Sequence, residues 1–261
     1  MATAKNAGKQ VRVRPVPAVS RSIAILRLLG RTGRPLGVKA IADELGLVPS
    51  TCLHILRVLV SEEFVRVEAD TKRYMLGSGM LALARSVLES SSFAQLAQPA
   101  LDRLAARGVT AMLVEVTARQ NVMVLALARS SHPFHLHTDV GSQFSTLVSA
   151  TGRLIAAHSG ETWAQLQKKF KTIAWDKAPS FEAWKKDVEQ ARRRGWSVDR
   201  DSFMAGVTVV AVPIFGPRGD LTHTLVGAGL SSHLTAPITA ELAAAMQQEA
   251  QDLADLLLVR S

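Results

Sequence analysis

The sequence predicts an α+β protein of two domains, a small helical one with a β-hairpin and a larger one that mixes strands and helices. Two observations predict the smaller domain. Residues 36–63 form two short apolar-periodic segments around Gly46, and two apolar runs around a charged turn follow them. The third observation is that the rest of the chain has antiparallel hairpins at either end, with helices between and outside them. This order indicates a sensor-like α+β domain rather than a doubly wound sheet.

Length and composition set the broad class. The chain has 261 residues, enough for two cores, and its 48% hydrophobic and 20% charged residues are typical of globular proteins. No apolar run is long enough to cross a bilayer, and the N-terminus has no signal-peptide pattern. The single cysteine, Cys52, excludes an internal disulfide and suits a reducing compartment. We therefore expect a cytoplasmic protein without membrane contacts.

Basic charge is concentrated near the N-terminus. Residues 1–90 hold fourteen Lys and Arg against seven Asp and Glu, whereas residues 91–261 hold seventeen against fifteen. A clustered basic surplus is typical of a domain that binds phosphate groups, although a solvated tail gives the same count. Residues 1–16 lack periodicity, and we predict a disordered basic arm that either contacts DNA or solubilises the chain.

Residues 17–77 predict a winged helix-turn-helix. A first helix starts near residue 18 and has an apolar face formed by Ile23, Leu26 and Leu29. Two further helices, residues 38–45 and 49–62, are joined by a tight turn at Gly46. The later one has four apolar residues at helical spacing, which predict its buried stripe: Cys52, Ile55, Leu56 and Leu59. Its opposite face is polar and suits a DNA major groove.

The hairpin after these helices would form the wing, with apolar runs at residues 64–67 and 73–76. Candidate DNA contacts follow from position on the motif or from positive charge: Arg21, Lys39, Pro49, Ser50, Thr51, His54, Arg57, Lys72 and Arg73. Arg57 is the strongest candidate, because a guanidinium can donate to a base edge or to a phosphate. The alternative is that all of them are ordinary surface residues.

Residues 78–91 are predicted to form a linker helix, and residues 92–261 a separate domain. Within it, periodicity predicts helices at residues 93–107, 146–158, 161–170, 179–194 and 236–259. Strands are predicted at residues 110–117, 121–129, 134–137, 196–198, 207–215 and 221–229. Five apolar residues are expected in the core, some of them lining a pocket: Met112, Leu113, Leu125, Phe134 and Phe144.

The chain resembles the IclR family of bacterial transcriptional regulators. The resemblance covers residues 15–257, and it rests on the order of the segments VSRSIAILRLL, IADELGL followed by ST, RYMLGSGMLALA, VSATGRLIAA and GWSVDRDSFMAGVTVVAVPIF. It implies a homodimer or dimer of dimers, in which a winged helix binds a double-stranded DNA operator. It also implies a C-terminal effector-binding domain of GAF/PAS-like topology that takes a small, usually acidic metabolite.

The resemblance also implies the effector site. Backbone amides at Ala150, Thr151 and Gly152 would meet the ligand, since a helix N-terminus suits a carboxylate. The remaining positions are Asp199 and, on the two terminal strands, Val207, Val209, Gly227 and Gly229. Val209 and the two glycines stand where relatives carry Cys or Ser, which predicts a roomier and less polar pocket. His54 and Pro49 replace basic residues of relatives, which predicts an unusual operator.

Other chemistry is not expected. His132, His135 and His137 could place two imidazoles on one strand face, but no third ligand has a fixed spacing, so we predict no metal site and no cofactor. Arg153 would either clamp a ligand or point outward, and we favour the outward orientation. Asp199 and Asp201 lack a nucleophile or matched partner, which argues against catalysis. The favoured function is a regulator responsive to a small organic acid; the alternatives are an enzyme with an accessory DNA-binding domain and a ligand-free dimerisation module.

Overall fold

A computed structural model describes residues 16–90, 92–117, 121–131, 136 and 138–258 of the protein. The chain divides into two compact units, residues 1–90 and 91–261. Each unit has a hydrophobic core of its own. The predicted basic arm lies outside the described residues, apart from Val16.

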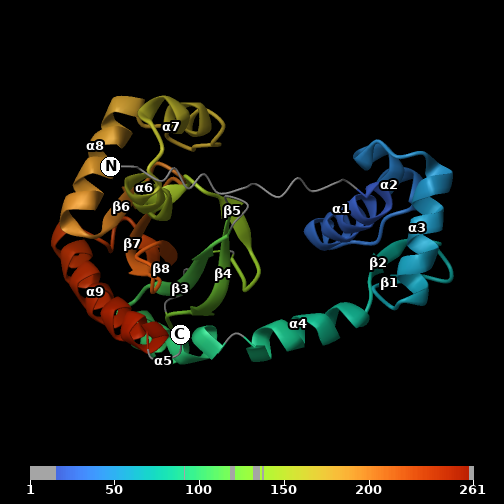
Figure 1. Ribbon diagram of the computed structural model, residues 1–261, viewed down its shortest axis with the longest axis horizontal. Helices are drawn as coiled ribbons and strands as arrows, with labels where there is room; N and C mark the ends of the chain where they lie inside the picture. The colour runs from blue at the N-terminus through green and yellow to red at the C-terminus, as the bar shows by residue number, and fades with distance from the viewer. Residues whose placement is uncertain (1–15, 91, 118–120, 132–135, 137, 259–261) are drawn as a thin grey trace, which may run out of the picture. The chain divides into compact units, whose positions relative to one another are not determined.

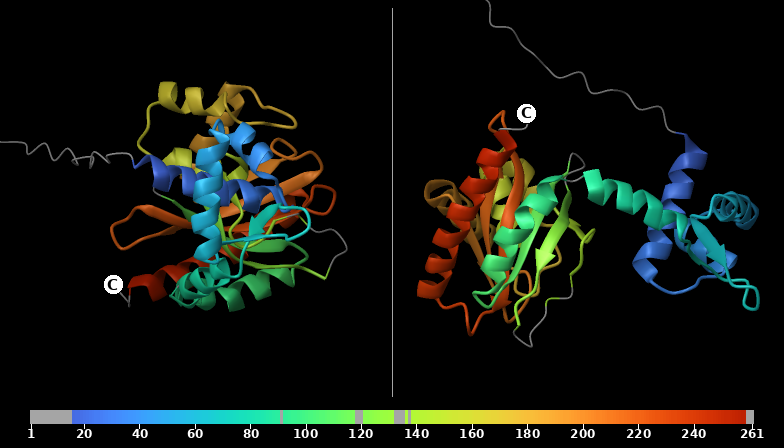
Figure 2. Two further views of the ribbon diagram at one scale, coloured as in Figure 1. Left: turned by 90° about the vertical axis from the view of Figure 1, so that its right-hand side faces the viewer. Right: turned by 90° about the horizontal axis from the view of Figure 1, so that it is seen from below.

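The N-terminal unit consists of helices and one antiparallel hairpin (Figure 1). Its helices are α1 (Pro17–Thr32), α2 (Val38–Leu45), α3 (Pro49–Ser61) and α4 (Gly79–Ser90), and its strands are β1 (Val65–Val67) and β2 (Tyr74–Leu76). Val67 lies opposite Tyr74 in the hairpin. Figure 2 shows the hairpin beside the helices, where β2 packs against α1 and β1 against α3. The predicted helix-turn-helix with a wing is confirmed.

The core of this unit confirms one predicted helix face and corrects another. The apolar stripe of α3 is buried, apart from Ile55, which is half-buried. In α1, Ile23 was predicted to face inward but is 40% exposed. The buried stripe of α1 consists of Ile25, Leu28 and Leu29. The helix carries apolar residues in two phases, and packing against α2 and α3 selects one of them.

The C-terminal unit contains a six-stranded antiparallel sheet of order β5-β4-β3-β8-β7-β6. The strands are β3 (Thr110–Val116), β4 (Asn121–Ala128), β5 (Gln143–Ser145), β6 (Ser197–Arg200), β7 (Val207–Phe215) and β8 (Leu221–Leu230). The helices are α5 (Ser92–Ala105), α6 (Ser149–His158), α7 (Trp163–Phe170), α8 (Phe181–Arg194) and α9 (Ala236–Leu258). The predicted α+β class is confirmed.

Two stretches differ from the predicted elements of this unit. Residues 143–145 form β5, which was not predicted, and α6 begins at Ser149 rather than at Thr146. The predicted strand at residues 134–137 falls largely outside the described residues, and the one described residue in it, Leu136, is not in a strand. Short edge strands with few apolar residues leave little periodicity to detect.

The sheet separates two apolar cores (Figure 1). Side chains alternate along β7, so Val210, Val212 and Ile214 face α5 and α9, whereas Val209 and Ala211 face α6 and α8. Helices therefore cover both faces of the sheet, and the two faces can serve different purposes.

His223 on β8 is a largely buried titratable group on the α5 side. Its ring centroid lies 4.8 Å from that of Phe93, and Nδ1 is 3.0 Å from the Thr222 hydroxyl. Burial lowers the pKa of His223 to about 4. The folded protein therefore holds this imidazole neutral at pH 7.

Replacing His223 by Gln is expected to flatten the acid side of the stability curve. An unfolded histidine titrates near pH 6.5, roughly, whereas folded His223 is charged only near pH 4. Between these values the unfolded state binds more protons, so the free energy of unfolding falls as the pH is lowered from 6.5 toward 4, roughly, by up to about 1.4 kcal/mol per pH unit. Urea unfolding across this range measures the slope. The pH dependence due to His158 remains in the variant, because burial also lowers the pKa of His158. A slope equal to that of the wild type would contradict the assignment of this pH dependence to His223.

Candidate functional site

The turn at Gly46 sets the direction of α3. Gly46 has a φ of 61°, in the left-handed region that favours glycine, and the Leu47 N–H donates to the Ala42 carbonyl oxygen at 2.8 Å. The axes of α2 and α3 consequently differ by 114°. This geometry buries one side of α3 and leaves the other side in solvent.

The outer face of α3 carries the predicted DNA contacts. Ser50, His54 and Arg57 are exposed, as is Pro49 in the first turn, while Thr51 is half-buried. The sequence interpretation missed Val58, which is 60% exposed. Its signal was available, because Val58 lies four residues after His54 and so on the same helix face. An apolar side chain there can contact a thymine methyl group.

The other basic candidates are also exposed. They come from α1, the first turn of α2 and the wing: Arg21, Lys39, Lys72 and Arg73. In the wing turn, the Glu68 N–H donates to the Arg73 carbonyl oxygen at 2.8 Å, and the Lys72 N–H donates to that of Glu68 at 3.0 Å. These bonds close the turn, and the two basic side chains remain free to meet phosphates.

A cavity of about 100 Å³ lies in the C-terminal unit, on the α6 side of the sheet. Its walls come from the sheet, the segment before α6, the start of α6 and residues 201–206. The lining is Met112, Val122, Leu136, Thr138, Phe144, Val148, Ser149, Thr151, Phe203, Met204, Val207, Val209 and Val226. Met112 and Phe144, both predicted as core residues that could line a pocket, are among them.

The cavity has few polar groups, and two of them are unpaired. The hydroxyls of Ser149 and Thr138 are buried and have no hydrogen-bond partner among the described residues. The Thr151 hydroxyl lies 3.4 Å from that of Thr224. α6 begins at Ser149 without a side-chain cap from Val148, so its first N–H groups have no capping acceptor. Buried hydroxyls normally find partners, which makes this end of the cavity a place for a ligand oxygen.

The predicted effector residues fall into four groups. Thr151, Val207 and Val209 line the cavity. Ala150 and Gly152 lie behind its wall: the Ala150 carbonyl accepts from the Ser197 hydroxyl at 2.6 Å, and a Cβ on Gly152 would meet the Leu147 carbonyl oxygen at 2.2 Å. Gly152 therefore lets the segment before α6 pack tightly against the helix. Their backbones shape the helix start without lining the cavity.

The two strand glycines were predicted to enlarge the pocket, and this placement is wrong. A Cβ on Gly227 would point at Leu242 and Met246 of α9, and one on Gly229 would point at Leu234. Both glycines thus face the side of the sheet opposite to the cavity. On β8 it is Val226 that lines the cavity, because neighbouring strand residues face opposite sides.

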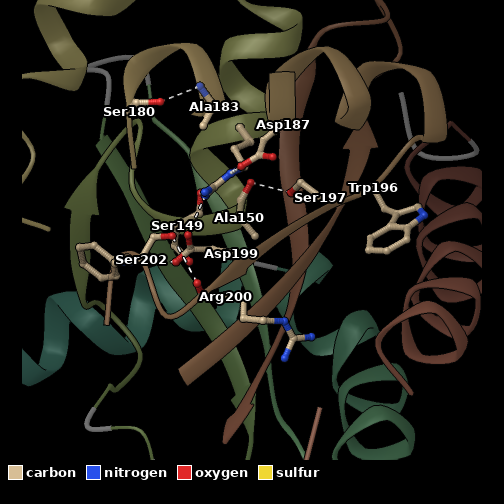
Figure 3. A network of polar contacts seen from close by, with 12 residues as sticks. Ser149, Ala150, Ser180, Ala183, Asp187, Trp196, Ser197, Asp199, Arg200 and Ser202 are labelled. Atoms are coloured by element: carbon tan, nitrogen blue, oxygen red, sulfur yellow. Dashed lines mark hydrogen bonds and ion pairs between the residues drawn. The ribbon is translucent and has the colours of Figure 1, made fainter. Parts of the chain in front are cut away.

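Arg153 was predicted to point outward, and this is also wrong. Its side chain is 2% exposed, and Nη1 lies 2.9 Å from Asp199 Oδ1 and 2.9 Å from the Ser149 carbonyl oxygen. Nε also lies 3.2 Å from Asp187 Oδ2. Figure 3 shows Ser149 and Asp199 next to each other, with Asp187 contributed by α8. The guanidinium is therefore neutralised beside the helix start.

Asp199 acts in this structure as an organising residue rather than as part of the cavity lining. It is 1% exposed, and its Oδ2 accepts from the Phe203 N–H at 3.0 Å. Asp176 and Asp201 hold the same loop, through the N–H groups of Ala205 and Gly206, both at 2.9 Å. A hydrogen bond from Ser231 lowers the pKa of Asp201. These carboxylates fix the loop that places Phe203 and Met204 in the cavity wall.

Comparison with known proteins covers both halves of this arrangement. Residues 18–69 match the IclR helix-turn-helix domain, and residues 85–255 match the family described as bacterial transcriptional regulator IclR C-terminal. The chain belongs to the IclR family. It is therefore a DNA-binding transcriptional regulator with a C-terminal ligand-binding domain, and not an enzyme.

Curated and solved relatives agree with this membership. The glycerol operon regulatory protein of Streptomyces griseus is 29% identical over 206 residues, which cover 78% of this chain and 81% of that protein. The transcriptional repressor AllR of Escherichia coli K12 is 23% identical over 221 residues, covering 84% and 82%. A crystal structure of an IclR transcriptional regulator from Alicyclobacillus acidocaldarius shares the fold, with a TM-score of 0.81 at 23% identity, and covers 94% of this chain and 100% of that one.

Metal and membrane sites were not predicted for this IclR-family chain. His132, His135 and His137 lie outside the described residues, and the described part contains no group of three or more His, Cys, Asp or Glu able to hold a metal ion. Within that same part, no single helix is long and apolar enough to span a membrane; the only bent pair that reaches this length and composition is α2 with α3.

Replacing Arg153 by Ala is expected to lower the free energy of unfolding by about 3–5 kcal/mol, because it leaves the buried Asp199 carboxylate without its counter-ion. The double variant Arg153→Met, Asp199→Leu should lose less free energy of unfolding than either of its two substitutions made alone. Chemical denaturation of the full chain measures each value. Arg103→Ala is the control, because it removes the ion pair between Arg103 and Glu249. The Arg103 side chain is 61% exposed, so this variant should change stability only marginally. Equal effects of Arg153→Ala and Arg103→Ala would contradict the prediction.

Proposed function

We propose that this regulator senses a small organic acid in the cavity at the start of α6, and that binding changes its affinity for an operator. The observation that carries the proposal is the pair of unpartnered, buried hydroxyls of Ser149 and Thr138 in an otherwise apolar cavity. An unpaired buried hydroxyl costs roughly 1–3 kcal/mol, which a ligand oxygen would recover. The N-terminal end of α6 adds partial positive charge, which favours an anion.

The proposal favours an effector over a ligand-free dimerisation module. A module that only dimerises has no use for a cavity with unpaired hydroxyls, because filling the space with apolar side chains would be more stable. Ligand binding regulates only if it prefers one conformation or assembly, and the same coupling then applies in reverse to DNA.

The domain organisation follows from this proposal. We propose that residues 17–77 bind the operator, that residues 78–91 connect the two domains, and that residues 92–261 bind the effector and mediate assembly. The proposed basic arm, residues 1–16, lies outside the described residues apart from Val16. We propose that the protein works in the cytoplasm as a dimer or dimer of dimers. Two α3 helices would then contact two half-sites of one duplex, as expected for a symmetric reader.

The effector claim predicts that at least one small carboxylate raises the unfolding temperature of the full chain. The same acid should change the affinity for a duplex that this protein selects from random-sequence DNA. Val209→Phe fills the cavity from β7 and should abolish both responses while DNA binding without acid persists. An unaltered response in that variant, or no response to any acid, would refute the effector claim.

The DNA claim predicts that Arg57→Ala combined with His54→Ala weakens operator binding at least tenfold, since a lost base or phosphate contact costs about 1–3 kcal/mol. Both side chains are exposed on α3, so folding and assembly should persist. Electrophoretic mobility shift at fixed salt measures the loss, and size-exclusion chromatography checks assembly. Arg66→Ala is the matched control, because this exposed arginine lies on β1. Unchanged binding by the α3 variant would overturn the assignment of the reading face.

A further inference from the structure

The walls of the cavity carry no charged side chain among the described residues. Ten of the thirteen lining residues are apolar: Met112, Val122, Leu136, Phe144, Val148, Phe203, Met204, Val207, Val209 and Val226. The other three carry only hydroxyls, at Thr138, Ser149 and Thr151. A second charge on a ligand would therefore be buried without a counter-ion, which is strongly unfavourable.

Arg153 is the positively charged residue closest in sequence to the Ser149 hydroxyl, and two aspartates already neutralise it. Arg153 lies four residues after Ser149, but its guanidinium is held by Asp199 at 2.9 Å and Asp187 at 3.2 Å. It also donates to the Ser149 carbonyl oxygen, which directs it to the helix backbone. Among the described residues of the wall, only neutral donors are then available to a ligand carboxylate.

Neutral donors are present in the wall of the cavity. Ser149 is 8% exposed and Thr138 3% exposed, and each presents a hydroxyl that lacks a partner among the described residues. The first N–H groups of α6 start at the same Ser149. A carboxylate has about four acceptor sites, so a single one can take both hydroxyls and a backbone N–H. A helix N-terminus stabilises one negative charge without a paired cation.

The size of the cavity limits the rest of the ligand. Its volume of about 100 Å³ is smaller than that of an apolar protein cavity known to take benzene, roughly 150 Å³. The apolar body of the ligand is therefore no larger than one ring or a short branched chain. Phe144, Phe203, Met112 and Met204 supply the aromatic edges and soft sulfur atoms that suit such a body.

We infer that the effector is a compact monocarboxylate with an apolar body, either one ring or a short branched aliphatic chain. The described part of the walls is uncharged and mostly apolar, and it therefore disfavours dicarboxylates, polyols and small polar acids such as hydroxy and oxo acids. This inference rests on the proposed function, because it names the chemical class of the acid that the same cavity binds. Selectivity comes from the valines on β7 and β8 and from walls whose described residues include no cation.

The experiment is isothermal titration calorimetry on the full chain, with matched probes. Benzoate and isovalerate represent the two bodies, benzamide and isovaleramide remove the charge, phthalate and succinate add a second charge, and glyoxylate and glycerate remove the apolar body. Benzoate or isovalerate should bind at least tenfold more tightly than its own amide and than any of the diacids or polar acids, because a hydrogen bond to a charged group is worth about tenfold or more.

The other outcomes separate this inference from the proposed function. If glyoxylate, glycerate or a diacid binds most tightly and changes operator affinity, the inference of an apolar ligand body is overturned, whereas the proposed sensing of an organic acid is retained. Amides that bind as well as acids would overturn the carboxylate. Failure of benzoate and isovalerate alone overturns the inference. Failure of every acid, with no acid changing operator affinity, overturns the proposed function as well.

Two variants test the named contacts. Thr138→Val keeps the shape but removes an unpaired hydroxyl, and should weaken the acid about tenfold while amide binding stays unchanged. Thr138→Ser restores the hydroxyl and should recover affinity, which separates hydrogen bonding from a folding defect. Val209→Ala enlarges the apolar end and should shift preference from benzoate toward an alkyl-substituted benzoate. Equal acid affinity in Thr138→Val and wild type would overturn the assigned polar end.

Discussion

The arrangement of the ligand-binding half depends on the buried ion pair between Arg153 and Asp199. Both side chains are at most 2% exposed, so each would be strongly disfavoured alone. Hydrogen bonds to the Ser149 carbonyl oxygen and from the Phe203 N–H satisfy further polar groups of the pair. The start of α6, the strand β6 and the loop that places Phe203 in the cavity are thereby joined at one point.

The same pair decides what kind of recognition the cavity can offer. Because Asp199 and Asp187 neutralise the Arg153 guanidinium, its positive charge stabilises the fold instead of binding a ligand. The described wall of the cavity offers hydroxyls, the start of α6 and apolar side chains. Under the proposed function, these groups favour recognition of one carboxylate through neutral donors over a salt bridge, and the shape of the apolar walls sets which ligand body fits.

The DNA-binding half relies on a different and more local constraint. Gly46 takes a left-handed conformation that turns the chain between α2 and α3, and a stripe of apolar residues buries one side of α3. The exposed side follows from helical geometry once that stripe is buried. Under the proposed function, the two halves are coupled by thermodynamic linkage. An acid that binds one state of the protein more tightly changes its affinity for the operator, and the operator changes the affinity for the acid by the same factor.

The sequence by itself determined the helix-turn-helix, the wing, the long strands and the exposed polar face of α3, because local periodicity and turn residues encode them. Tertiary structure alone decided the inward face of α1, where two apolar phases compete, and the burial of Arg153 against an aspartate on a distant strand. It also decided that Val209 and Val226 line the cavity while Gly227 faces α9. A strand pattern that is apolar on both faces does not reveal which face meets which helix, because that depends on sheet pairing and packing.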